Sequence, residues 1–111
     1  MILQFIVRRM KNVQISESRE GEVITLMIGG RVDTNTSPEF QEAILKSFQK
    51  VNQVVLDFQN CTYVSSAGLR VLLVGQKTAG SKSGMMKLVH VPEMLMSVLK
   101  LSGFSKFLTI E

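Results

Sequence analysis

Apolar and polar residues alternate with a period of two in several short segments, and each of these segments predicts a β-strand. Residues 13–18 and 23–28 alternate in this way on either side of a polar turn, which predicts a β-hairpin. Short apolar runs at 54–58 and 86–89 predict strands of a buried sheet. Residues 104–110 could supply the last strand and close that sheet.

Apolar residues recur at helical spacing between these strands, which predicts three helices. Pro38 suits the first turn of a helix, and Thr36 with Glu39 has the spacing of a capping box. A second helix is predicted from Ser66 to about residue 78, and Pro92 opens a third. The residues expected to face the core are Phe40, Ile44, Leu45 and Phe48 of the first helix, and Leu95, Val98 and Leu99 of the last.

Strands that alternate with helices imply βαβ crossovers and a parallel sheet. The predicted fold is a single α/β domain: a mixed, mostly parallel β-sheet flanked by α-helices, with the N-terminal antiparallel hairpin at its edge. A chain of 111 residues, 45% of them apolar, can fill one modest core. We assign residues 10–111 to this domain and residues 1–9 to an N-terminal extension, which could instead be an extra edge strand or follow from an upstream start codon.

Ser66 stands where a predicted strand gives way to a predicted helix. The free N–H groups and the positive dipole end at a helix start favour an anion such as phosphate by about 0.3 to 1 kcal/mol. The Ser66 hydroxyl is therefore a good phosphate acceptor on chemical grounds. Alternatively, Ser65 or Ser66 is an ordinary helix N-cap, and local chemistry alone favours that interpretation.

The segment Tyr63-Val64-Ser65-Ser66-Ala67-Gly68-Leu69 resembles the signature of STAS domains, the fold of bacterial anti-sigma factor antagonists and of sulfate-transporter cytoplasmic tails. In the antagonists an Asp precedes the phosphorylated serine. Here Ser65 replaces that Asp, and Ser66 falls on the phosphorylated position. Two further segments resemble the family's Gly-x-Leu-Asp motif and its C-terminal helix end: Gly30-Arg31-Val32-Asp33-Thr34 and Leu99-Lys100-Leu101-Ser102-Gly103-Phe104.

The resemblance, which covers about residues 13–110, implies a stand-alone anti-sigma factor antagonist in a partner-switching pathway. The unphosphorylated form would bind an anti-sigma factor that is also a serine kinase. Phosphorylation at Ser66 would abolish binding, and a metal-dependent serine phosphatase would restore it. The alternative is a non-phosphorylated STAS adaptor subunit of an ABC-type lipid transporter, which the serine at position 65 leaves open. The residues implied for kinase or partner binding are Asp33, Thr34, Ser65, Ser66, Ala67, Gly68 and Leu69.

For two of these residues, Asp33 and Gly68, the sequence allows a more specific prediction of their role. Asp33 is expected beside Ser66, where it orders the loop. Gly68 lies two residues into the predicted helix, where glycine costs about 0.8 to 1 kcal/mol relative to alanine. Either a partner's backbone or ATP phosphates approach Gly68 closely, or its turn packs tightly against the Asp33 loop. We expect Gly68→Val to reduce phosphorylation of Ser66 far more than it lowers folding stability.

Charge and motifs argue against several other classes of protein. The net charge of +4 is spread along the chain without a run of five basic residues, so we expect a solvated surface and no nucleic acid partner. The chain has no run of 18 uncharged apolar residues, so we expect no membrane insertion and a cytoplasmic location. It also contains no GxGxxG, Walker or GxSxG motif, so we do not expect an enzyme.

The lone Cys61 and the lone His90 point to no chemistry of their own. A single cysteine cannot form an intrachain disulfide, which fits a reducing cytosol, and Cys61 is interpreted as a packing residue. Metal ligation by His90 would need partners, so we place it at a loop edge. Asp57 is expected to end a strand as a turn former rather than to pair with Asp33. We therefore predict neither a cofactor nor a metal site.

Overall fold

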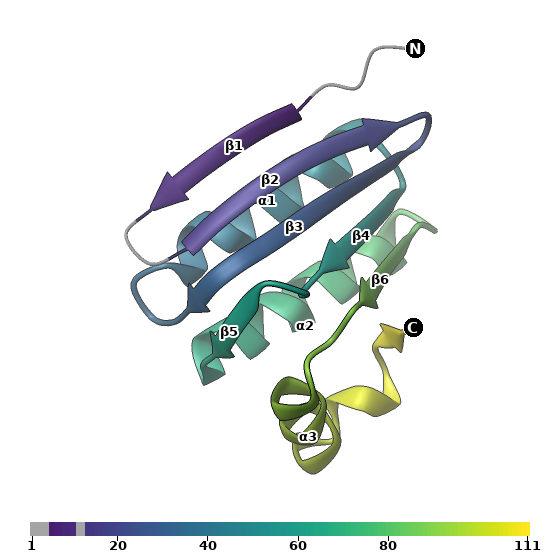
Figure 1. Cartoon of the computed structure of the whole chain (residues 1–111). Coiled ribbons are helices and arrows are strands. Elements are labelled where there is room, and N and C mark those ends of the chain that lie inside the picture. Colours follow the sequence, from purple (N-terminus) through teal and green to yellow (C-terminus); the bar gives the residue numbers. More distant parts are fainter. Residues whose placement is uncertain (1–4, 11–12) are drawn as a thin grey trace.

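A mixed β-sheet of seven strands forms the centre of the computed structural model, which describes residues 5–10 and 13–111 (Figure 1). The strands are β1 (Phe5–Met10), β2 (Val13–Glu20), β3 (Val23–Val32), β4 (Gln53–Asp57), β5 (Cys61–Val64), β6 (Met85–Val89) and β7 (Thr109–Ile110). Their order is β1-β2-β3-β4-β6-β7, and β5 pairs with β3 off this path. The first three strands are antiparallel neighbours, and every later pairing is parallel.

The predicted hairpin consists of β2 and β3, with Val13 opposite Gly30 at its open end. β3 pairs in parallel with β4, and β4 with β6, so the predicted α/β fold with an antiparallel N-terminal edge is confirmed. β1 lies beside β2 as an antiparallel edge strand (Figure 1). The division into an extension (1–9) and a domain (10–111) remains a prediction, and residues 1–4 of that extension lie outside the described residues.

The long strand β3 changes its parallel partner near its end. Its first half pairs with β4, and its last residues pair with β5, across a register shift between Gly30 and Arg31. Gly30 adopts a φ of +84°, a conformation that costs glycine little and other residues more, and its N–H donates to the Asn60 carbonyl at 3.0 Å. The strand β5 was not predicted from the sequence, where only residues 54–58 were assigned to a strand before α2.

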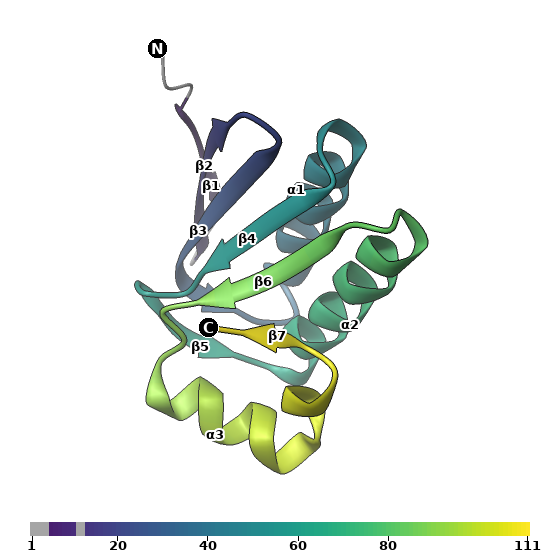
Figure 2. The same ribbon diagram turned by 90° about the vertical axis from the view of Figure 1, so that its right-hand side faces the viewer.

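Helices α1 (Ser37–Lys50) and α2 (Ser66–Ser81) cover one face of the sheet, while α3 (Glu93–Ser102) lies beyond its end, near β5 (Figure 2). A short 3-10 turn (Phe104–Lys106) connects α3 to β7. Alternate strand residues enter the core between the sheet and the two helices, as a period of two requires. The largest fully buried side chains are Phe40, Phe48, Phe58, Ile15, Ile24, Leu26, Ile28, Ile44, Leu56, Leu72, Met86 and Leu88.

The expectation that Val98 faces the core is wrong. Helix α3 packs through Leu95 and Leu99, and Val98 lies on its exposed side with Met94 and Leu101. All of these residues fit an amphipathic helix, and the face that is buried depends on what the helix packs against. Among the described residues, no helix is both long and apolar enough to cross a membrane.

Candidate functional site

The candidate site lies at the sheet edge where β3 and β5 end side by side. Val32 pairs with Val64 in the parallel register, and the Ser65 N–H donates to the Val32 carbonyl at 2.8 Å. The chain enters the loop before α1 at Asp33, and it enters α2 directly after Ser65. The same edge therefore carries both segments that the sequence singles out, and the starts of both helices.

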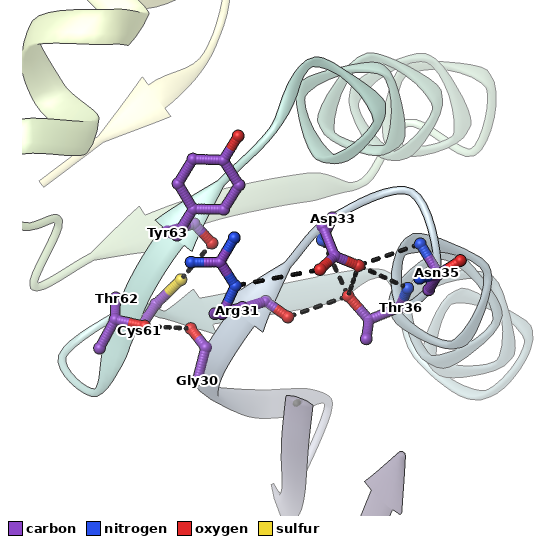
Figure 3. A network of polar contacts seen from close by, with 8 residues as sticks. All are labelled: Gly30, Arg31, Asp33, Asn35, Thr36, Cys61, Thr62 and Tyr63. Atoms are coloured by element: carbon purple, nitrogen blue, oxygen red, sulfur yellow. Dashed lines mark hydrogen bonds and ion pairs between the residues drawn. The ribbon is translucent and has the colours of Figure 1, made fainter. Parts of the chain in front are cut away.

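Asp33 orders the loop that leads into α1 (Figure 3). Its Oδ1 accepts hydrogen bonds from the N–H groups of Asn35 at 3.0 Å and Thr36 at 3.1 Å. Desolvation works to raise the pKa of Asp33. The hydrogen bonds from Thr36 and Asn35, and the Arg31 charge, outweigh it, so this pKa lies below its ordinary value. The carboxylate thus stabilises the loop before α1 through these hydrogen bonds, and Figure 3 shows it turned toward the start of that helix.

The predicted capping box at Thr36 is wrong. Thr36 is buried, its φ and ψ of −104° and −15° are not the extended values usual for an N-cap, and its side chain makes no capping hydrogen bond. Its hydroxyl accepts the Asp33 N–H at 2.8 Å and donates to the Arg31 carbonyl at 2.9 Å. Because these two bonds occupy the hydroxyl, Thr36 ties the loop back to β3.

Arg31 connects the two strand ends on the exposed side. Its guanidinium lies 4.3 Å from the centre of the Tyr63 ring, and its Nε lies 4.0 Å from Asp33 Oδ2. The first contact is a cation–π interaction between β3 and β5, and the second is a long, solvent-exposed ion pair of small energetic weight. The contact between Arg31 and Tyr63 was not predicted, because the strand register that brings the two residues together is not visible in the sequence.

The two serines at the start of α2 have different environments. Ser65 occupies the N-cap position with extended backbone, but its side chain makes no capping hydrogen bond. Its Oγ is buried and has no hydrogen-bond partner among the described residues. Ser66 is the first residue of α2 and is exposed. The helix start therefore has an accessible hydroxyl at position 66, and no side chain caps its free N–H groups.

Gly68 is buried where α2 crosses the ends of β3 and β5. A Cβ at this position would lie 2.6 Å from Cγ1 of Val64 and 2.9 Å from Cγ1 of Val32, closer than any real contact. Of the two interpretations left open by the sequence, the structure supports packing, against the two valines. Valine cannot fit in this space without movement of the neighbouring valines, so Gly68→Val should also lower folding stability substantially, which weighs against the expectation that its main effect would be on phosphorylation.

The remaining candidate residues differ in accessibility. Thr34 is exposed, Ala67 is half-buried, and Leu69 packs against the core. Ala67 and Arg70 of α2 line a hollow that Ser37 and Gln41 of α1 close from the other side. Arg70 was not among the sequence candidates. Its position four residues after Ser66, on the same face of a helix, is the signal that could have identified it.

Asp57 and Cys61 have structural partners. Asp57 Oδ1 accepts the Gln59 N–H at 2.9 Å, as expected of a turn former, and lies 3.1 Å from His90 Nδ1. Burial raises the pKa of the Cys61 thiol, whose Sγ lies 3.6 Å from the Tyr63 carbonyl oxygen. Among the described residues, no three histidine, cysteine or acidic side chains cluster as metal ligands would.

A family model described as "Mlab, STAS domain" matches residues 15–110, and the chain therefore belongs to the STAS domain family. A STAS-domain containing protein of Pseudomonas aeruginosa is 27% identical over 93 residues, which cover 84% of this chain and 92% of that protein. An anti-sigma F factor antagonist of Paenibacillus polymyxa is 28% identical over 103 residues, which cover 89% of this chain and 86% of that protein.

The fold is similar to that of the anti-sigma factor antagonist SpoIIAA. Its unphosphorylated form superimposes with a TM-score of 0.70 at 14% identity, covering 97% of this chain and 87% of SpoIIAA. The phosphorylated form from Bacillus has a TM-score of 0.68 at 15% identity, covering 97% of this chain and 91% of that one. The chain is thus a STAS domain whose fold is that of anti-sigma factor antagonists.

Proposed function

We propose that this protein is a cytoplasmic anti-sigma factor antagonist that is switched by phosphorylation of Ser66. The unphosphorylated form binds an anti-sigma factor that is also a serine kinase, and this binding frees the sigma factor. The kinase phosphorylates Ser66 and thereby abolishes binding. A metal-dependent serine phosphatase removes the phosphate. The chain is the substrate of these reactions and performs no catalysis itself.

The observation that carries this proposal is the exposure of Ser66, the first residue of α2. A kinase active site must reach the hydroxyl, and the neighbouring Ser65 oxygen is buried. The family relationship and the antagonist named among the curated relatives support the same role. SpoIIAA, whose fold is similar, has been solved in both unphosphorylated and phosphorylated forms.

The switch follows from the charge that phosphorylation adds. A phosphate group carries about 1.5 to 2 negative charges at pH 7. At the start of α2 that charge meets the positive end of the helix dipole, so the fold tolerates it. In a partner interface the same group would be an unpaired buried anion, which is costly. Phosphorylation therefore weakens binding and leaves the fold intact.

Mass spectrometry after incubation with the cognate kinase and ATP tests the acceptor. We expect the phosphate on Ser66, no labelling of Ser66→Ala, and normal labelling of the matched variant Ser65→Ala. Ser65 Oγ is buried whereas the residue Ser66 is exposed, so Ser65→Ala changes the helix start without removing the proposed acceptor. Labelling of Ser66→Ala at the wild-type rate would contradict the proposal.

The second candidate function is a non-phosphorylated adaptor subunit of an ABC-type lipid transporter. One observation favours it: Ser65 supplies no charge at the position where, as the resemblance implies, antagonists carry an Asp. A pull-down from native lysate distinguishes the two functions. Recovery of a kinase-like protein supports the antagonist, whereas recovery of a permease supports the adaptor.

A further inference from the structure

Arg70 lies on α2, about one turn after Ser66. Residues four apart on a helix lie on the same face, with their Cβ atoms about 5 to 6 Å apart. Arg70 is exposed and lines the hollow between α1 and α2. Among the described residues, its guanidinium takes part in no ion pair and no hydrogen bond.

The other charged groups at this edge are already engaged. Arg31 stacks on Tyr63 and lies near Asp33, whose carboxylate accepts hydrogen bonds from the α1 loop. Arg70 is therefore a cation four residues after Ser66 on α2, and it has no ion-pair or hydrogen-bond partner among the described residues. The helix start also lacks a side-chain cap, so its free N–H groups can donate hydrogen bonds to an anion as well.

We propose that Arg70 binds the phosphate group of phosphorylated Ser66 and holds it against α2. This inference rests on the proposed function, because it takes Ser66 as the phosphate acceptor. An anion that precedes a cation by four residues is the favourable order on a helix. A guanidinium also presents a planar pair of N–H donors that matches two phosphate oxygens. The modified state is then an ordered one, with its new charge paired within the chain.

The pKa of the phosphate reports this pairing directly. Phosphoserine can be inserted at position 66 during translation, and phosphorus NMR then measures the second pKa of the phosphate by pH titration. A guanidinium partner favours the dianion and lowers this pKa. Relative to the wild-type chain, we expect Arg70→Gln to raise the pKa by about 0.2 to 0.4 pH units, the equivalent of a typical helical ion pair.

Two further variants make the test specific. Arg70→Lys keeps the charge and should restore most of the lowering, whereas a role of Arg70 in folding alone would not depend on charge. Lys77→Gln removes an exposed cation of α2 three turns from Ser66 and should leave the phosphate pKa unchanged. About 1 M salt should reduce the difference between wild type and Arg70→Gln.

An identical phosphate pKa in wild type and Arg70→Gln overturns the inference. If Arg70→Gln and Lys77→Gln change the phosphate pKa equally, the inference is also overturned. The pKa then responds to the net charge of the protein and not to a specific partner. The titration needs no kinase, because phosphoserine is inserted during translation. Failure of a kinase to label Ser66 therefore counts against the proposed function alone. A phosphate pKa that does not change in Arg70→Gln counts against the Arg70 pairing alone.

Discussion

Two residues at the β3–β5 edge, Gly68 and Asp33, determine how the helix starts pack against the strand ends. Gly68 has no side chain where one would collide with Val32 and Val64, and this absence allows α2 to lie close to the strand ends. Asp33 uses its carboxylate to hold the α1 loop. Both residues therefore have structural roles within the chain, and these roles require no contact with a partner protein.

We predict that Gly68→Ala lowers the free energy of unfolding by about 1 to 2 kcal/mol. Overpacking costs about 1 to 3 kcal/mol, and it outweighs the gain of up to about 1 kcal/mol in helix propensity. Gly80→Ala is the matched control in the same helix, because nothing lies within 4 Å of its added Cβ. Urea denaturation should show Gly80→Ala equal to or more stable than wild type. Equal stability of both variants would contradict the packing role.

Asp33 should make stability depend on pH in the acid range. Its pKa is lowered by folding from an ordinary value of 3.8, so the unfolded chain takes up the proton first as the pH falls. The stabilisation is present above that ordinary value and is lost as the pH falls through the lowered pKa. Asp33→Asn keeps an oxygen acceptor and loses the charge. We expect its melting temperature to be lower than that of wild type near pH 6.

The difference between wild type and Asp33→Asn should close as the pH falls below about 4, where Asp33 itself is progressively protonated. Melting curves recorded between about pH 2 and pH 6 test this. Parallel pH profiles for the two proteins would show that the carboxylate charge adds no stability to the folded state.

At the scale of elements, α3 carries apolar side chains on two faces. Leu95 and Leu99 are buried, while Met94, Val98 and Leu101 follow one another at helical spacing on the exposed side. Leu101 is 89% exposed. The helix thus packs mainly through Leu95 and Leu99, and the nearly fully exposed Leu101 should contribute little to folding.

We predict that Leu101→Ala changes the free energy of unfolding by less than about 0.5 kcal/mol, as exposed substitutions usually do. Leu99→Ala, the same chemical change on the buried face, should cost about 2 to 5 kcal/mol. Denaturant titration of both variants tests which face of α3 is packed. A large loss of stability in Leu101→Ala would mean that this side chain is covered in solution.

At the scale of the whole molecule, the proposed switch is a change of charge on a fixed fold. We predict that Ser66→Asp weakens binding to the anti-sigma factor at least tenfold, or about 1.4 kcal/mol, because an interface would bury its carboxylate. The free energy of unfolding should stay within about 0.5 kcal/mol of wild type, because Ser66 is exposed at the positive end of the α2 dipole.

Ser66→Asn is the matched control for this prediction, since asparagine has the same shape as aspartate without the charge. It should bind more tightly than Ser66→Asp. Calorimetric unfolding and a binding titration with the anti-sigma factor together decide the outcome. Strong destabilisation with unchanged binding would show that Ser66 is a structural residue.

Local patterns in the sequence were sufficient for the class of fold. Alternation over residues 13–28 predicts the hairpin, and helical spacing predicts α1 and α2, because both signals depend only on near neighbours along the chain. The position of Ser66 at the start of α2 follows in the same way. The sequence therefore determined the α/β architecture and located the hydroxyl that we propose as the phosphate acceptor.

Long-range contacts decided what the sequence left open or predicted wrongly. Pairing of β5 with β3 joins residues about 30 positions apart, and it places Val32 beside Val64 so that Gly68 is a packing residue. The Thr36 hydroxyl bonds to the β3 end instead of capping α1, and Val98 faces outward because α3 packs through its other side. Each outcome depends on which elements meet in space, and the spacing of residues along one element cannot specify its neighbours.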